Sequence, residues 1–247
     1  MSPSEVKLEP LDPEVLENLR RASTATLATQ LFKQGLHQPF LVGVKPVNPG
    51  IEGFVGEATT MRFIPSREDI DPLNDPYRTG GNQLQWDAIE NLQPGQVLVV
   101  DSRNDVRAAS GGDILITRAM CRGAAAFVTD GAVRDGGTLA SLPFPVYSNT
   151  VTATTRAAFH HVAELQVAIG CAGVAVYPGD VLVGDRDGIV VVPRALAPVI
   201  AKPAYAQEKL EAYLVTRIKA GEPLQDIYPP SAATLADYRA TLTEETR

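Results

Sequence analysis

The residues best suited to chemistry lie in a glycine-rich segment, 131–137, which contains Arg134 and Asp135. Arginine offers a planar fork for a carboxylate, and aspartate is a hard oxygen ligand suited to Mg²⁺. The segment follows an apolar run, and ligands of α/β proteins bind beyond the carboxyl ends of strands, where glycines let the backbone approach them. The pair therefore predicts a site for an anion and a divalent metal. From spacing alone, a turn that merely caps a helix remains an open alternative.

A second glycine-rich segment could face the same ligand. Gly111 and Gly112 are followed by Asp113, Ile114 and Leu115, where we expect a helix to begin. The free amides of a helix N-terminus favour anions. The sequence thus predicts that both segments bind one anionic ligand.

The elements that must position these residues form a β-α-β unit. Apolar runs at 96–101 and 125–130 are typical of strands buried on both faces, and a helix is predicted between them at 112–122. Upstream, we expect a strand at 53–64 and a helix at 82–92. The polar stretch between these two elements is long enough to be a lid.

The flanking regions supply further elements. We predict helices beginning near Asp12 and Ser23, a short strand at 144–147 and a helix at 154–168. The last part of the chain is predicted to contain a β-meander over 173–192, a long helix over 195–220 that Pro203 could interrupt, and a final helix over 232–243. We interpret residues 1–247 as one domain with a C-terminal helical extension.

Composition excludes several classes of protein. The chain has 247 residues, 21% of them charged, and a net charge of −7, which argues against a nucleic-acid partner. No apolar run reaches the roughly 20 residues that a bilayer requires, so no membrane segment is expected. The first ten residues lack the basic and apolar regions of a secretory signal, and we expect a cytoplasmic protein.

Familiar catalytic motifs are missing from the sequence. It contains no dinucleotide-binding or P-loop glycine pattern, no H-E-x-x-H and no G-x-S-x-G. Cys121 and Cys171 have no ligand spacing, and we interpret both as buried thiols. His160 and His161 fall in the helix predicted at 154–168, where we expect surface or packing roles. The segment 185–188 is predicted to be a hairpin turn and not a calcium loop.

Three stretches, in this order, resemble one known family: PGQVLVVD at 94–101, GDILITRAMCRGAAAFVTDGAVRD at 112–135 and PGDVLVGDRDGIVVVP at 178–193. The family includes 4-hydroxy-4-methyl-2-oxoglutarate/4-carboxy-4-hydroxy-2-oxoadipate aldolases and the regulator of ribonuclease activity A. The likeness covers about residues 20–225. Its most specific part is the spacing from Gly112 to the Arg134-Asp135 pair.

The resemblance implies an α/β fold, a three-layer β/β/α sandwich of the phosphohistidine-swivelling type, assembled as a homotrimer or a dimer of trimers. It also implies a lyase dependent on Mg²⁺ or Mn²⁺ that acts on a small 2-oxo acid. Such an enzyme cleaves 4-hydroxy-2-oxo acids to pyruvate and often decarboxylates oxaloacetate. Both reactions pass through a pyruvate enolate, whose charge a metal ion and a guanidinium stabilise.

The resemblance also implies roles for individual residues. Asp135 would bind the metal, Arg134 would hold the pyruvyl oxygens, and Asp113 would support metal-bound water. The substrate would be bound, beside Arg134, by four further residues: Gly112, the amides of Ile114 and Leu115, and Asn82.

The chain departs from the family pattern at two positions. Trp86 lies one helical turn after Asn82, where histidine is common, and Thr138 lies three residues after Asp135, where an acidic residue is usual. The missing acidic group could be replaced by Asp130, or by Glu208 or Glu211 of a neighbouring subunit.

Two alternatives to the pyruvate lyase stay open. One is a non-catalytic binding protein of the ribonuclease-regulator kind, a branch that tends to lack the metal-binding aspartate; the presence of Asp135 favours the enzyme. The other is a different enolate-forming enzyme on the same scaffold, suggested by Trp86 and Thr138.

Overall fold

The computed structural model describes residues 9–69 and 80–244, without the side chains of 80–82 and 243–244. Its helices are α1 (Pro13–Arg20), α2 (Thr24–Lys33), α3 (Gly80–Glu90), α4 (Asp113–Cys121), α5 (Gly136–Leu139), α6 (Ala197–Lys219) and α7 (Ala232–Glu244), with 3-10 turns η1 (Arg156–Ala158) and η2 (Arg194–Leu196). Its strands are β1 (Lys45–Pro46), β2 (Phe54–Pro65), β3 (Gln96–Asp101), β4 (Ala126–Thr129), β5 (Ala132–Val133), β6 (Val146–Ser148), β7 (Thr150–Val151), β8 (His160–Leu165), β9 (Ile169–Cys171), β10 (Val174–Val176), β11 (Val181–Gly184) and β12 (Ile189–Val192).

A mixed sheet with the strand order β1-β6-β4-β3-β2-β11-β12 forms the centre of the molecule. Strands β2, β3, β4 and β6 run parallel to one another, as the predicted β-α-β unit requires. On the edge opposite β3, the long strand β2 pairs with β11 near its start and with β8 near its end. Because β3 and β4 are parallel neighbours, the loops that leave their carboxyl ends meet at one edge of the sheet.

Alternate residues of the strands build two separate cores. Val97 and Val99 of β3 pack with the β9–β10 hairpin on one face, whereas Leu98 and Val100 pack with α3 and α4 on the other. This period of two is what an extended chain buried on both sides imposes. Helices therefore cover one face and a small second sheet covers the other, which confirms the predicted α/β class with its β/β/α layering.

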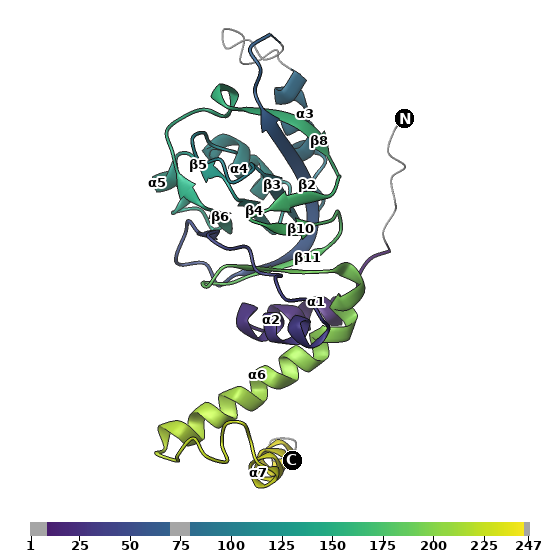
Figure 1. Cartoon of the computed structure of the whole chain (residues 1–247), viewed down its shortest axis with the longest axis vertical. Coiled ribbons are helices and arrows are strands. Elements are labelled where there is room, and N and C mark those ends of the chain that lie inside the picture. Colours follow the sequence, from purple (N-terminus) through teal and green to yellow (C-terminus); the bar gives the residue numbers. More distant parts are fainter. Residues whose placement is uncertain (1–8, 70–79, 245–247) are drawn as a thin grey trace.

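A third cluster joins the N-terminal helices to the long C-terminal helix. Leu27 and Leu31 of α2 are fully buried with Ile200 and Ala204 of α6, against strands β11 and β12. Helices α1 and α2 begin where the sequence predicts, and Asp12 and Ser23 cap them through their side chains. Figure 1 shows that α6 then leaves the body of the molecule and ends beside α7. Helix α6 continues through Pro203, so the interruption considered there is absent.

The helix predicted at 154–168 is wrong. The segment contains the short turn η1 and strand β8, which pairs antiparallel with β2. Along β8 the side chains of His160 and Val162 are buried, and those of His161 and Ala163 are partly exposed, which is the alternation of a strand. His160 is accordingly a packing residue, although in a strand and not in a helix.

Other predictions are confirmed only in part. Strands β11 and β12 form a hairpin whose turn contains 185–188, but β10 pairs with β9, so the region is not one meander. Cys171 is buried as expected, whereas Cys121 is exposed. The lid predicted between β2 and α3 lies largely outside the described residues.

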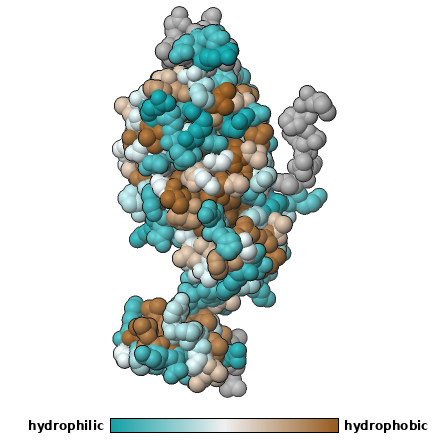
Figure 2. Space-filling view, in the orientation of Figure 1, coloured by the Kyte–Doolittle hydropathy of each residue, from teal (hydrophilic) through white to brown (hydrophobic). Residues whose placement is uncertain are grey.

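The surface is mixed in polarity. In Figure 2, hydrophilic and apolar residues are interspersed over the sheet region, and apolar residues gather around the end of α6 and α7. Val215, Leu224 and Tyr228 are exposed there. Across residues 9–69 and 80–244, we find no helix with the length and apolar character needed to cross a membrane.

Candidate functional site

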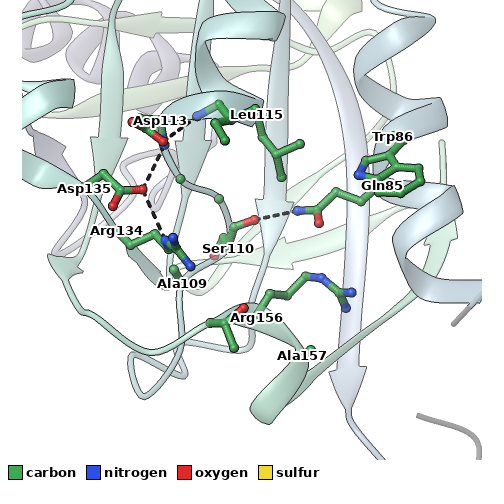
Figure 3. Close-up of a pocket in the computed structure, with 14 residues that line it drawn as sticks. Gln85, Trp86, Ala109, Ser110, Asp113, Leu115, Arg134, Asp135, Arg156 and Ala157 are labelled. Carbon is green, nitrogen blue, oxygen red and sulfur yellow. Dashed lines mark hydrogen bonds and ion pairs between the residues drawn. The ribbon is translucent and has the colours of Figure 1, made fainter. Parts of the chain in front are cut away.

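Six of the predicted site residues line one pocket of about 350 Å³ at the edge of the sheet where β3 and β4 end. Arg134 and Asp135 form one side, the first turn of α4 forms the back, and α3 and η1 supply the opposite side (Figure 3). Two segments that are far apart in the sequence therefore meet as predicted. The contacts of the pair also include those of the capping alternative, because Oδ2 of Asp135 accepts the first amide of α4 and pairs with Arg134.

Asp135 is fixed by two hydrogen bonds to one of its oxygens. Oδ2 accepts from the Asp113 amide and from Arg134 Nε, each at 3.2 Å. The residue has φ 62° and ψ 35°, a left-handed conformation that aspartate tolerates better than most residues. This backbone turns the chain from β5 into α5. It leaves the side chains of Arg134 and Asp135 about 45% and 30% exposed to the pocket and solvent.

Position 112 must be glycine because the side chains of Arg134 and Asp135 lie very close to its backbone. A Cβ atom at Gly112 would lie 2.6 Å from Oδ2 of Asp135 and 2.9 Å from Cγ of Arg134. Carbon–oxygen contacts this short are not tolerated without displacement. The glycine therefore permits the contact between the two segments, in agreement with its predicted place in the site.

The first turn of α4 presents its backbone amides to the pocket. The first regular helical bond is made by Ile116, whose amide donates to the Gly112 carbonyl, so the amides before it precede the helical ladder. The Ile114 amide donates to Oδ1 of Asp113 at 2.7 Å. Ile114 and Leu115 both line the pocket.

The opposite wall comes from α3 and η1. Gln85 is buried and donates from Nε2 to the Ser110 carbonyl at 2.7 Å, which ties α3 to the loop before α4. Trp86 is 40% exposed and faces the pocket. Arg156 is only 8% exposed, and its Nη1 donates to the His160 carbonyl at 2.6 Å. The pocket thus has a guanidinium on two of its sides.

The environment of Asp135 favours its charged form. The hydrogen bond from the Asp113 amide lowers the pKa of the Asp135 carboxyl from its ordinary value, and Arg134 lowers it further by a smaller amount. Partial burial opposes this shift without reversing it. At neutral pH the site therefore offers a carboxylate anion to a cation.

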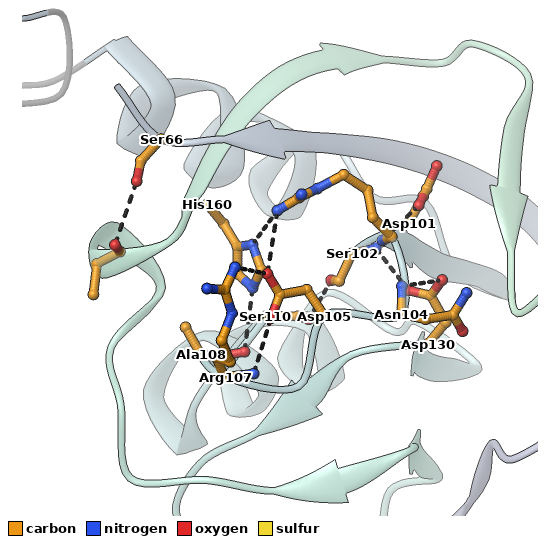
Figure 4. A network of polar contacts seen from close by, with 12 residues as sticks. Ser66, Asp101, Ser102, Asn104, Asp105, Arg107, Ala108, Ser110, Asp130 and His160 are labelled. Atoms are coloured by element: carbon orange, nitrogen blue, oxygen red, sulfur yellow. Dashed lines mark hydrogen bonds and ion pairs between the residues drawn. The ribbon is translucent and has the colours of Figure 1, made fainter. Parts of the chain in front are cut away.

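A buried polar network holds the loops that carry the site (Figure 4). The Ser110 hydroxyl lies 2.6 Å from that of Ser102 and 2.7 Å from that of Thr129. Both oxygens of Asp130 accept backbone amides, at 2.7 Å from Ser102 and at 3.0 Å from Asn104. Burial raises the pKa of Asp130, and these amides oppose that shift. The network joins the ends of β3 and β4 and so fixes the floor of the pocket.

The structure brings together six predicted residues: Gly112, Asp113, Ile114, Leu115, Arg134 and Asp135. Asn82 belongs to α3, but its side chain lies outside the described part of the structure. Asp130 serves the loop network, so it is not available as the replacement for an acidic group at Thr138. Within the same chain, Glu208 accepts from the amide and hydroxyl of Ser23.

Sequence reasoning missed Gln85, Thr155 and Arg156, and it noted Trp86 only as a departure from the family pattern. The omission of Thr155 and Arg156 had one main cause. A helix at 154–168 gave no reason to place Arg156 near Arg134. The sequence gives no local signal for the strand, because residues 160–165 (HHVAEL) do not alternate between polar and apolar types.

Comparison with known proteins identifies relatives of this chain. Residues 24–191 match the RraA-like family, described as Aldolase/RraA. A protein of Halalkalibacterium halodurans, provisionally named 4-hydroxy-4-methyl-2-oxoglutarate aldolase, is 32% identical over 155 residues, 60% of this chain and 71% of that protein.

Solved structures show the same fold. A Streptomyces coelicolor protein, titled an unusual member of the RNase ES inhibitor RraA protein family, has a TM-score of 0.75 and 30% identity, covering 84% of this chain and all of that one. An uncharacterized protein from Pseudomonas syringae pv. tomato has a TM-score of 0.76 and 26% identity, covering 90% of this chain and all of that one.

Proposed function

Because this chain belongs to the RraA-like family, we propose that it is a divalent-metal-dependent lyase that releases pyruvate from a 2-oxo acid. The observation that carries the proposal is the contact of Arg134 and Asp135 with the N-terminus of α4 in one pocket. A cation ligand, a guanidinium and helix-terminal amides are the groups that binding a 2-oxo acid with a metal requires. The provisional aldolase names of the relatives agree with this chemistry.

The donor set fits Mg²⁺ or Mn²⁺. Asp113 and Asp135 both line the pocket, and Mg²⁺ is commonly bound through one or two carboxylates, with water and substrate oxygens completing its shell. Among the described residues, no group of three or more His, Cys, Asp or Glu could hold a metal, so they offer no closed cage of the zinc type. Asp135 would hold the ion, which would act as a Lewis acid towards the 2-oxo group.

The chain's own residues account for the remaining requirements. In a retro-aldol reaction the C3–C4 bond of a 4-hydroxy-2-oxo acid breaks, the 4-hydroxyl loses its proton, and a pyruvate enolate and a carbonyl product are formed. Protonation of the enolate at C3 then gives pyruvate. We assign Arg134 to stabilising the negative enolate oxygen and the Leu115 amide to holding the substrate carboxylate, because both residues line the pocket.

Proton transfer is assigned to a carboxylate. No histidine is among the described residues that line the pocket. Asp113 stands at the start of α4 beside Asp135 and can accept the hydroxyl proton directly or through a water molecule. Decarboxylation of oxaloacetate needs no such base, because loss of CO₂ leads to the same enolate.

We also propose that the active site is completed in a homotrimer or a dimer of trimers. A second hollow of about 430 Å³ adjoins the outer side of Arg134 and Asp135 and is bordered by Val151, which is 50% exposed. A side chain of another subunit could enter there and reach the metal. That side chain would replace the acidic residue that is usual at position 138, where this chain has threonine.

A non-catalytic regulator is the second candidate, because the Streptomyces coelicolor relative is titled a member of an RNase ES inhibitor family. A regulator would act through its surface and would not need Asp135 to be charged. The presence of the complete Arg134-Asp135 site favours the lyase.

The deciding experiment is pyruvate release from oxaloacetate and from 4-hydroxy-4-methyl-2-oxoglutarate, with Mg²⁺ or Mn²⁺ and with EDTA. Rates are corrected for decomposition by the metal alone. We expect turnover that requires both protein and metal. Absence of turnover on both compounds, together with absence of metal binding, would reject the lyase in favour of the regulator.

A further inference from the structure

Gln85 is a polar residue on a face of α3 that is otherwise apolar and buried. Its spacing of three and four residues from Ala88 and Ile89 places all three side chains on one side of the helix. Ala88 and Ile89 are buried in the core that α3 forms with α4, and Gln85 is only 3% exposed. A buried carboxamide is unfavourable unless it is hydrogen-bonded, so an apolar residue would serve packing better. The glutamine therefore points to a role beyond filling the core.

The partner of Gln85 is the backbone just before α4. Its Nε2 donates to the Ser110 carbonyl at 2.7 Å, and Figure 3 shows the carboxamide reaching from α3 to that oxygen. On the other side of the segment, the Ser110 amide donates to the Ala132 carbonyl at 2.7 Å. The Gly111 carbonyl accepts the Arg134 amide at 3.0 Å. The segment before α4 is thus held by β5 and its continuation on one side and by Gln85 on the other.

The Gln85 bond fixes a peptide plane that is followed by two glycines. Residues 111–112 separate Ser110 from the first residue of α4, and glycine is the residue with the greatest backbone freedom. The direction of the Ser110 carbonyl sets the peptide plane that enters these glycines. That plane limits where the first amides of α4 point. A rotation there would also move the Asp113 amide, which donates to Oδ2 of Asp135.

Resting on the proposed function, we propose that Gln85 is a positioning residue: its carboxamide orients the Ser110 carbonyl and so holds the first amides of α4 in place for a substrate carboxylate. Gln85 acts through the backbone of residues 110–113 and not on the reacting atoms. Its loss should leave the charges of the pocket in place and weaken the binding of an anion. A residue that only filled the core would change the stability of the protein and leave the affinity of the folded molecules unchanged.

Two substitutions separate the hydrogen-bond donor from the volume that it fills. Gln85→Met keeps the length of the side chain and removes the donor. Gln85→Glu keeps the shape, and its ionised carboxylate can only accept hydrogen bonds. The matched control is Gln83→Met, because Gln83 lies on the exposed side of α3 and donates to Oδ1 of Asp87 at 2.7 Å.

The first measurement is hydrogen exchange of the full-length protein without any ligand. Backbone amides in residues 109–116 should exchange about tenfold faster in Gln85→Met and in Gln85→Glu than in the wild type, because the segment has lost one of its supports. Amides of β12, on the other side of the sheet, should exchange as in the wild type. General destabilisation would instead accelerate exchange in both regions. Gln83→Met should leave both regions unchanged.

The second measurement is the Kd for oxalate in Mg²⁺. Oxalate is a planar dianion that resembles the pyruvate enolate, and Trp86, the only tryptophan of the chain, lines the pocket and reports binding by its fluorescence. We expect binding about five- to tenfold weaker in Gln85→Met, the effect of one lost hydrogen bond, and unchanged binding in Gln83→Met. Gln85→Glu is left out of this comparison, because its charge would act on the anion directly. A Kd is unaffected by a partly unfolded fraction.

Wild-type affinity for oxalate in Gln85→Met, or wild-type hydrogen exchange of residues 109–116 in both Gln85 variants, would overturn the proposal. Absence of oxalate binding by the wild type would also overturn it, because α4 would then present no anion site to position. These outcomes are separate from failure of the lyase. Pyruvate release with unaltered oxalate affinity in Gln85→Met rejects only the role of Gln85. The expected changes in exchange and affinity without pyruvate release support that role and reject the catalytic function.

Discussion

The amide nitrogen of Asp113 lies 3.2 Å from Oδ2 of Asp135, so the start of α4 holds the carboxylate that follows β5. Arg134 Nε contacts the same oxygen at the same distance. One carboxylate therefore connects two segments that are separated by 22 positions in the sequence. Different substitutions at this junction should affect metal binding, substrate binding and folding to different extents.

Asp135→Asn should abolish metal binding while the fold is kept. Asparagine has nearly the same shape and can still accept from the Asp113 amide, but it lacks the charge that holds a divalent cation. For the wild type, Mg²⁺ at a hundredfold excess over its Kd should stabilise the folded state by about 2.7 kcal/mol. This corresponds to a rise in Tm of roughly 5–10 °C for a chain of this size. The variant should show no rise, and its metal-dependent turnover should fall by about 100-fold or more.

Asp187→Asn is the matched control, because Asp187 lies in the exposed turn between β11 and β12. It should respond to Mg²⁺ as the wild type does. An undiminished Mg²⁺-dependent rise in Tm in Asp135→Asn would place the metal elsewhere.

Gly112→Ala should disrupt the junction sterically. The added methyl would lie 2.6 Å from Oδ2 of Asp135 and 2.9 Å from Cγ of Arg134, so these two side chains would have to shift. Overpacking of this kind costs about 1–3 kcal/mol of stability. Turnover should fall more than tenfold, because small displacements of positioned groups are costly to catalysis.

Gly170→Ala in β9 provides the comparison, since no atom of the described residues beyond its two chain neighbours lies within 4 Å of the position that its methyl group would take. Urea unfolding and pyruvate release should both remain near wild type in this variant. Normal turnover in Gly112→Ala would show that the close approach to Asp135 is dispensable.

Stability should depend on pH through His160. Burial lowers the pKa of this imidazole, whose Nδ1 lies 3.1 Å from Nη2 of Arg103 and whose Nε2 lies 3.3 Å from the Ala108 carbonyl. Arg103 can donate only to a neutral Nδ1, so protonation would place two positive groups in contact. The Ala108 carbonyl and nearby Asp105 oppose this effect without reversing it.

The direction in which stability changes with pH follows from the number of protons that the folded and unfolded chains bind. Below the ordinary histidine pKa of about 6.5, the unfolded chain binds a proton that the folded chain resists. The free energy of unfolding, measured by urea denaturation, should therefore fall as the pH drops from about 7.5 to about 5.5. In His160→Gln the fall should be smaller, although this variant should also be less stable at both pH values. An equal fall in both proteins would assign the pH dependence to other groups.

The site segment was predictable because local and tertiary signals agree there. Gly95 precedes the apolar run of β3, and Gly131 follows that of β4. Residues 131–137 come almost directly after β4, and residues 111–115 follow β3 after the loop 102–110. Parallel pairing of the two strands then leaves one arrangement for their loops. The contact between Gly112 and Asp135 needed the resemblance or the structure, because spacing does not reveal a distance.

The other side of the pocket was not predictable from local pattern. Residues 154–168 contain alanine, leucine and glutamate, which favour helices, but the exposed edge of β2 pairs with residues 160–165 and imposes a strand. Burial of His160 and Val162 on the α3 side stabilises that pairing. Arg156 reaches the pocket only because the chain turns at η1 before it enters β8. Its position is therefore a product of tertiary structure.

Arg134→Lys should distinguish stabilisation of the enolate from simple substrate binding. Lysine keeps the charge but lacks the planar fork. If Arg134 acts on the charge that develops during bond cleavage, kcat/KM should fall by about 100-fold while KM changes little. Oxalate, a planar dianion that resembles the pyruvate enolate, should lose affinity by a similar factor. Arg118→Lys, on the same helix as the anion-binding amides but facing Glu90, should leave both quantities unchanged. A rise in KM with constant kcat and constant oxalate affinity would instead limit Arg134 to holding the substrate in its ground state.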